Sequence, residues 1–308
     1  MATTTRIGII GMGRVGTSAA VSVLHSGVAE ELLVHDLDEA VAEGEAMDLA
    51  HGLAYVPRAV VRTAALDDLR QTDAIVVAAG KSGTASQSRL ELARDNVVTA
   101  RHIATALRGY AGLVIVVTNP VDVLTFEIAR TAGLPAERVI GTGTMLDTAR
   151  LRHAIGRTLN VAANSVHAQV VGEHGDSEVV LWSSARAAGL PLRMWSQWDP
   201  AFEAQVGDEV RTAAYEIIKR KGATNHAIGM VTAALLRTCL RGENRVLTVS
   251  RVQEGAFGLS DVALSLPAVV GTSGASRVLE PEMNADERER LAHSSHVLRE
   301  AIAAAGAG

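Results

Sequence analysis

Three side chains in the middle of the chain have the types and the spacing that proton transfer on an anionic substrate needs. Asp147 and Arg150 are three positions apart, so on a helix they share one face. His174 follows an apolar run and stands in a Gly-flanked turn, from which a side chain reaches a cleft more easily than from inside an element. A histidine with a carboxylate partner exchanges protons near neutral pH, and an arginine holds a substrate carboxylate through two parallel hydrogen bonds. We therefore predict that the three form one site.

Each of these residues taken alone has a plainer interpretation. An Asp–Arg pair at this spacing is most often a surface ion pair of small energy. A lone histidine in a Gly-rich turn is structural more often than catalytic. The rest of the chain must therefore decide between the two interpretations.

The composition is that of an ordinary globular protein. With 308 residues, 48% of them hydrophobic and 20% charged, the chain is long enough for two domains with separate cores. A net charge of −5 without a Lys/Arg run excludes an electrostatic surface for nucleic acid or membranes. The single Cys239 excludes an intrachain disulfide, and we find no Cys/His cluster that would bind a metal. The N-terminus lacks a signal-peptide pattern and no apolar run is long enough to span a membrane, so we expect a cytoplasmic protein.

The N-terminal segment has the pattern of a dinucleotide-binding turn. A short strand at residues 6–10 leads into three spaced glycines and then into a helical pattern. Gly11 allows the tight turn, Gly13 lets the backbone approach a pyrophosphate, and Gly16 allows close packing of strand and helix. A second strand ends in Asp36, 20 positions after Gly16, where an acid binds the ribose hydroxyls and repels a 2′-phosphate. Together these features predict binding of NAD rather than NADP.

Two further apolar runs, residues 74–79 and 113–117, predict parallel strands that are buried on both faces. Polar residues follow each of them, at the end of the strand where open α/β sheets bind ligands. Asn119 therefore either contacts the ligand or serves as a turn residue before a proline. The small polar residues that lead to Arg89 have the composition of a mobile lid, or of an ordinary surface loop.

The second half of the chain predicts a mixture of helices and antiparallel strands. Helical patterns cover residues 146–159 and 201–221, and residues 245–250 and 262–270 read as antiparallel strands of a second domain. We therefore expect an α/β fold in two parts. A Rossmann doubly wound parallel sheet over residues 1–141 binds NAD, and a mixed α+β substrate domain covers residues 142–308.

With these residues set out, the chain resembles the L-lactate/malate dehydrogenase family over almost its full length. The resemblance rests on the motifs at residues 11–16, 35–52, 118–122, 141–150, 172–176 and 264–267, in this order. It implies an NAD-dependent oxidoreductase that interconverts an L-2-hydroxy acid and its 2-oxo acid. By the same resemblance His174 is the proton donor and acceptor, and Asp147 is its orienting partner. Arg150 grips the substrate carboxylate, and Arg89 closes over the site and polarises the substrate carbonyl.

The resemblance also implies contacts around these catalytic groups. Asn119 contacts both substrate and nicotinamide, Thr224 lines the substrate pocket, and Ile228 lines it beside the cofactor. A homodimer or homotetramer is implied as well. Arg152 and His167 stand where some bacterial lactate enzymes bind a sugar bisphosphate between subunits, although members without that regulation have similar residues.

The chain departs from the family at the residue that selects the substrate. This residue is six positions before the loop arginine, which gives Gly83 here, although Lys81 could take its place if the loop folds differently. Glycine neither fills a pocket nor meets a second carboxylate. We therefore expect a substrate with a side chain larger than that of lactate. The alternatives are malate and then lactate itself.

Two other classes share parts of this pattern. NAD-dependent glycosidases have the same fold, but they need a divalent metal and are typically longer. A non-catalytic NAD-binding protein would have lost some of the catalytic residues, whereas all four are present.

If Arg89 polarises the substrate carbonyl, Arg89→Ala removes a positive charge from the place where negative charge develops in the transition state. We expect kcat to fall by several orders of magnitude, with a moderate effect on substrate binding, in steady-state assays of NADH oxidation. An unchanged kcat would remove Arg89 from the mechanism.

Overall fold

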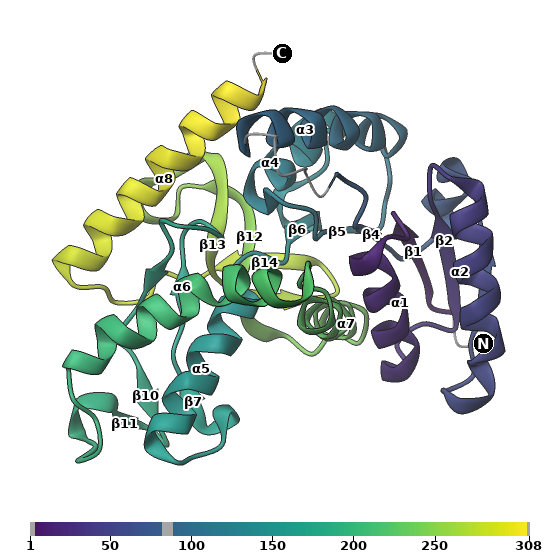
Figure 1. The fold of residues 1–308 in the computed structure, drawn as a ribbon. Coiled ribbons are helices and arrows are strands. Elements are labelled where there is room, and N and C mark those ends of the chain that lie inside the picture. The colour runs from purple at the N-terminus through teal and green to yellow at the C-terminus, as the bar shows by residue number, and fades with distance from the viewer. Residues whose placement is uncertain (1–3, 82–88, 307–308) are drawn as a thin grey trace.

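A single nine-stranded sheet lies at the centre of the protein (Figure 1). The structure is a computed structural model that describes residues 4–81 and 89–306, without the side chain of Arg89. The strand order is β14-β13-β12-β6-β5-β4-β1-β2-β3. Its parallel part has the order of a doubly wound dinucleotide-binding sheet and consists of β1 (Arg6–Ile10), β2 (Glu31–His35), β3 (Val60–Thr63), β4 (Ala74–Val77), β5 (Leu113–Val116) and β6 (Val139–Gly141).

The central strands are buried on both faces, as their continuous apolar runs predict. Side chains alternate along a strand, so β4 contributes to two cores at once. Ile75 and Val77 belong to the core on one face of the sheet, and Ala74 and Val76 belong to the core on the other.

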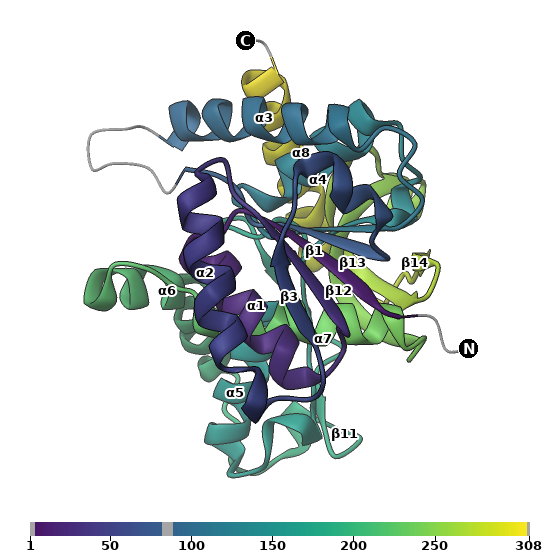
Figure 2. The ribbon, with the colours of Figure 1, turned by 90° about the vertical axis from the view of Figure 1, so that its right-hand side faces the viewer.

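Three helices cover each face of the sheet (Figures 1 and 2). On one face lie α1 (Arg14–Ser26), α2 (Glu39–His51) and α7 (His226–Leu240). On the other lie α3 (Arg89–Ala106), α4 (Val121–Ala132) and α8 (Ala285–Gly306). The helices α1 and α7 approach closely at Gly229, which has no side chain. A Cβ there would lie only 2.5 Å from the carbonyl oxygen of Ser18.

The predicted strands of the second half are antiparallel, as expected, and they do not form a sheet of their own. They form β12 (Arg245–Glu254) and β13 (Ser260–Gly271), which with β14 (Gly274–Val278) extend the parallel sheet from its β6 edge. Ser250 of β12 pairs with Gly141 of β6. A Cβ on Gly141 would lie 3.0 Å from the Cβ of Ser250, so the strands approach closely at this point. The extension covers an edge of β6 that would otherwise expose unpaired backbone groups. The sheet thus crosses the expected boundary at residue 141, and the division into two domains stays a prediction.

A separate small core supports the rest of the second half. It lies between α5 (Met145–Leu159) and α6 (Ala201–Lys221) and contains all three tryptophans, Trp182, Trp195 and Trp198. Short strands complete this region: β7 (Val166–His167), β10 (Arg186–Ala187) and β11 (Leu190–Pro191) form one sheet, and β8 (Val170–Val171) pairs with β9 (Val179–Val180).

None of the helices in the described part of the chain is long and apolar enough to cross a membrane. This finding does not test the expected cytoplasmic location, which stays a prediction. Among residues 4–81 and 89–306, no group of three or more His, Cys, Asp and Glu side chains is placed to hold a metal ion.

Candidate active site

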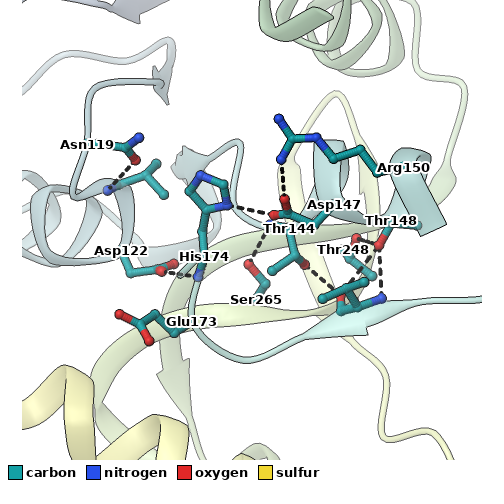
Figure 3. Close-up of polar contacts among 12 residues, drawn as sticks. Asn119, Asp122, Thr144, Asp147, Thr148, Arg150, Glu173, His174, Thr248 and Ser265 are labelled. Atoms are coloured by element: carbon teal, nitrogen blue, oxygen red, sulfur yellow. Dashed lines mark hydrogen bonds and ion pairs between the residues drawn. The ribbon is translucent and has the colours of Figure 1, made fainter. Parts of the chain in front are cut away.

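The structure brings the three predicted side chains into direct contact (Figure 3). His174 Nδ1 lies 2.6 Å from Asp147 Oδ2, and Arg150 Nη1 donates to Asp147 Oδ1 at 2.8 Å. The carboxylate is 2% exposed, so both of its oxygens face cationic partners rather than water. One buried carboxylate therefore orients both the imidazole and the guanidinium, and the structure places the three predicted side chains together, while their roles stay predictions.

The charges in this group shift two pKa values in opposite directions. Burial alone lowers the pKa of His174, but the charge of Asp147 and the hydrogen bond to it outweigh this effect and raise the pKa to about 9. Burial raises the pKa of Asp147, but the positive charges of His174 and Arg150 outweigh it, so the pKa lies below its usual range. The imidazole therefore keeps its proton through neutral pH.

The pair Asp147 and Arg150 lies in the first turns of α5. Asp147 is in the first turn, where the positive end of the helix dipole favours a negative charge. The start of the helix is fixed by Thr144, whose N–H donates to Ser265 Oγ at 3.0 Å and whose hydroxyl donates to the carbonyl oxygen of Val170 at 2.6 Å. Ser265 belongs to β13 of the central sheet and Val170 to β8 of the two-stranded sheet, so strands of both sheets set the position of the helix.

The turn that carries His174 is anchored by three other elements. The His174 N–H donates to Asp122 Oδ2 at 2.7 Å, at the start of α4. The Glu173 N–H donates to Ser294 Oγ of α8 at 2.7 Å. Gly172 forms an isolated antiparallel bridge with Ser265 of β13. These backbone bonds hold the imidazole in place independently of its own side-chain contact.

Asp122 and Ser294 also belong to this site, although neither was among the predicted residues. Asp122 lies in the polar segment after β5, where a signal was present, and it is 2% exposed. Burial raises its pKa to about 6. Ser294 lies inside a helix, where no local signal distinguishes it from other small polar residues.

A cavity of about 460 Å³ opens in front of His174 and Arg150. Asn119, Asp147 and residues of α3, α6 and α8 also line it. Asn119 Oδ1 accepts a hydrogen bond from the Val121 N–H at 3.3 Å, as a turn residue before a proline would (Figure 3). Asn119 also lines the cavity.

Four other predicted residues are not placed at this cavity by the structure. The described residues that line it do not include Thr224 or Ile228. Thr224 precedes α7, and Ile228 packs against the core beside α1. Gly83 and the side chain of Arg89 lie outside the described residues, although Leu90 of the same helix turn lines the cavity. The roles of all four stay predictions.

The Gly-rich turn has the space that a pyrophosphate needs. Gly11 has a φ of 94°, and a Cβ there would lie 2.4 Å from the backbone nitrogen of Ala79. A Cβ on Gly16 would lie 1.8 Å from the carbonyl oxygen of Gly11, whereas one on Gly13 would meet nothing within 4 Å. Gly13 precedes the first residue of α1, so open space lies beside the N–H groups at the start of this helix.

The predicted ribose-binding acid stands beside this turn. Asp36 Oδ2 accepts the Met12 N–H at 2.7 Å, and Oδ1 accepts the Asp38 N–H at 3.0 Å. The carboxylate is thus held at the ends of β1 and β2, next to the open space at Gly13. This arrangement fits the phosphate and ribose groups of a dinucleotide.

Comparison with known families agrees with this geometry. Residues 5–141 match the NAD binding domain of lactate/malate dehydrogenases, and residues 144–307 match the alpha/beta C-terminal domain of the same enzymes. The L-lactate dehydrogenase of Synechococcus sp. (strain JA-3-3Ab) is 43% identical over 297 residues, which cover 96% of this chain and 97% of that protein. That of Bacillus caldolyticus is 41% identical over 307 residues, with 97% and 96% covered.

Solved structures give the same result. The minor L-lactate dehydrogenase from Enterococcus mundtii, in a ligand-bound form, superposes with a TM-score of 0.95 at 34% identity and covers 97% of this chain and 98% of its own. A lactate dehydrogenase from a Medee basin deep-sea metagenome library gives a TM-score of 0.94 at 34% identity, with 98% and 99% covered.

The raised pKa of His174 leads to a prediction for Asp147→Asn. The amide retains a hydrogen-bond acceptor but removes the negative charge, so the pKa of His174 should fall by about 1–3 units. An NMR titration of histidine ring protons measures this shift, with Asp208→Asn as a control that removes an exposed carboxylate from α6. A His174 pKa that stays near 9 in Asp147→Asn would show that Asp147 does not cause the shift.

The same pKa shift makes stability depend on pH. The pKa of His174 in the folded protein lies above its ordinary value of about 6.5. The contribution of protonated His174 to the free energy of unfolding is therefore complete below about pH 6.5 and is lost as the pH rises through about 9. In urea unfolding at a series of pH values, the free energy of unfolding should therefore fall less between about pH 6.5 and pH 9 for Asp147→Asn than for the unmodified protein.

Proposed function

The chain belongs to the lactate/malate dehydrogenase family, and from this premise we propose that it interconverts L-lactate and pyruvate with NAD. It is an NAD-dependent enzyme of the L-2-hydroxy acid dehydrogenase type. Lactate is supported by the similar proteins, which are L-lactate dehydrogenases and match nearly the whole chain.

In this proposal the three contacting side chains divide the work. Arg150 holds the pyruvate carboxylate by paired hydrogen bonds, with Asp147 fixing the guanidinium. Because His174 Nδ1 bonds to Asp147, its Nε2 is left to donate a proton to the substrate oxygen during reduction and to take it back during oxidation. The cofactor, when bound, would supply the hydride as NADH during reduction and accept it as NAD⁺ during oxidation. The Gly-rich turn and Asp36 would hold its phosphates and ribose.

Arg89 and the domain division are further parts of the proposal. Arg89, at the start of α3, would stabilise the negative charge that develops on the carbonyl oxygen. Residues 1–141 would form the NAD-binding domain and residues 142–308 the substrate domain, as the family resemblance implies.

A single-carboxylate substrate agrees better with the charges of the cavity than a dicarboxylate does. Apart from Arg150, the arginine that lines the described part of the cavity is Arg211, which already pairs with Asp208 at 2.8 Å. Of the acidic side chains in the lining, Asp147 pairs with His174 and Arg150, and burial raises the pKa of Glu178 to about 8, which leaves Asp122, Glu173 and Asp176. A second substrate carboxylate would therefore meet an unfavourable field, which argues against malate.

The size of the substrate side chain is the point on which the sequence expectation and the comparisons differ. The expectation of a larger side chain depends on Gly83, outside the described residues, whereas the names of the relatives favour lactate. We therefore place lactate first and a larger 2-hydroxy acid second.

The values of kcat/KM for pyruvate, 2-oxoisocaproate and oxaloacetate, measured by NADH oxidation, test this order. We expect pyruvate to lead by about 10-fold or more, because methylene-sized differences in an apolar pocket are worth about 1–3 kcal/mol. A lead for 2-oxoisocaproate would support the larger substrate, and a lead of orders of magnitude for oxaloacetate would support malate. Inactivity with all three would contradict the proposal.

We also propose that the protein is a homo-oligomer. Apolar side chains are exposed on the helices of one face of the sheet, with Val21 of α1 at 41%, Met47 of α2 at 62% and Met230 of α7 at 66%. A second copy of the chain would cover this surface.

Light scattering should give the mass of two or four chains. Met230→Glu should shift the mass toward that of a single chain at low protein concentration, because it places a charge in the interface. Val98→Glu is the matched control, since Val98 is 67% exposed on α3 of the opposite face. A single-chain mass for the unmodified protein would contradict the proposal.

A further inference from the structure

The helix α6 forms one wall of the active-site cavity. Four of its residues line the cavity at helical spacing, on one face: Arg211, Ala214, Tyr215 and Ile218. Substrate side chains inside the cavity therefore meet this wall, and its position sets the room that they have.

The two halves of α6 are held very differently. Val206 and Val210, in the first half, are buried in the tryptophan-containing core. After Val210 the helix has no fully buried residue, and Tyr215 and Ile218 are 46% and 45% exposed. Apolar packing thus fixes the first half, while the half that faces the cavity needs another attachment.

A hydrogen bond provides this attachment. The hydroxyl of Tyr215 donates to Asp176 Oδ1 at 2.9 Å, and Asp176 belongs to the turn that carries His174. The turn itself is anchored to the sheet and to α4 and α8, so it is a fixed point for the helix.

The neighbouring side chains Arg211 and Glu178 do not replace this bond. Arg211 lies one turn before Tyr215 on the same face, and it lines the cavity together with Glu178. The Arg211 Nε and Glu178 Oε1 are buried, yet neither makes a hydrogen bond within the described part of the chain. Arg211 Nη1 instead pairs with Asp208 of its own helix.

We propose that Tyr215 is a positioning residue that ties the second half of α6 to the His174 turn and thereby sets the width of the substrate cavity. This inference rests on the proposed function, because it assigns to Tyr215 a part in substrate selection. Without the bond, the wall moves outward and confines a small substrate less well, while a larger substrate gains room.

Tyr215→Phe tests the proposal, because it removes the hydroxyl and keeps the ring. We expect the KM for pyruvate to rise about 5- to 20-fold with kcat changed less than about 3-fold, as the loss of a hydrogen bond to a charged group allows. The ratio of kcat/KM for 2-oxoisocaproate to that for pyruvate should rise by a similar factor. Tyr55→Phe is the control, since Tyr55 is 88% exposed and does not line this cavity.

A double-mutant cycle identifies the partner. Asp176→Ala should reproduce the KM effect of Tyr215→Phe, and the double variant should be no worse than the more affected single variant. Additive effects would show that the two side chains act separately, which would overturn the proposal.

Hydrogen exchange provides a readout that does not depend on the substrate. In Tyr215→Phe, amides of residues 212–221 should exchange faster while those of residues 203–210 remain unchanged. If pyruvate is not a substrate at all, the proposed function fails, but this measurement still tests the attachment of α6. Unchanged exchange in residues 212–221 would overturn the inference, and so would faster exchange with unaltered KM and specificity ratio.

Discussion

A carboxylate that is removed from water is strongly unfavourable unless opposite charges and hydrogen bonds replace its hydration. In this protein Asp147 meets that condition through His174 and Arg150, at 2.6 and 2.8 Å. Since the carboxylate is shared, neither partner can turn away without leaving a buried charge unpaired. The contact that makes burial of Asp147 tolerable therefore also orients the two side chains that face the cavity, and it keeps the imidazole protonated at neutral pH.

The continuous sheet explains how residues far apart in the sequence meet at this carboxylate. The helix that carries Asp147 starts directly after β6, and its first turn is bonded to Ser265 of β13. The turn that carries His174 is bridged to the same serine. Because β12 and β13 continue the parallel sheet, both halves of the site are attached to one hydrogen-bonded frame. The Gly-rich turn lies at the carboxyl end of β1 in this frame, where doubly wound sheets bind dinucleotides.

The α6 wall of the cavity is less buried in its second half than the catalytic side is. Backbone hydrogen bonds from three elements hold His174, whereas the second half of α6 has no fully buried residue. A site made in this way can keep its proton-transfer geometry constant while the wall that contacts the substrate side chain differs in position. Such a division suits this type of enzyme, because all 2-oxo acids undergo the same proton and hydride transfer but differ in their side chains.

The amino-acid pattern along the chain was enough to predict the features that depend on neighbouring residues. It predicted the bounds of β1 and α6, the Gly-rich turn before α1, and the shared face of Asp147 and Arg150, all set by local periodicity and turn chemistry. Tertiary structure alone decided that β12 joins β6, and that Asp122, Ser294 and Tyr215 bond to the His174 turn across 52, 121 and 39 positions. Local composition cannot distinguish such residues from others of their type, because their roles depend on which surfaces the packing of the whole chain brings together.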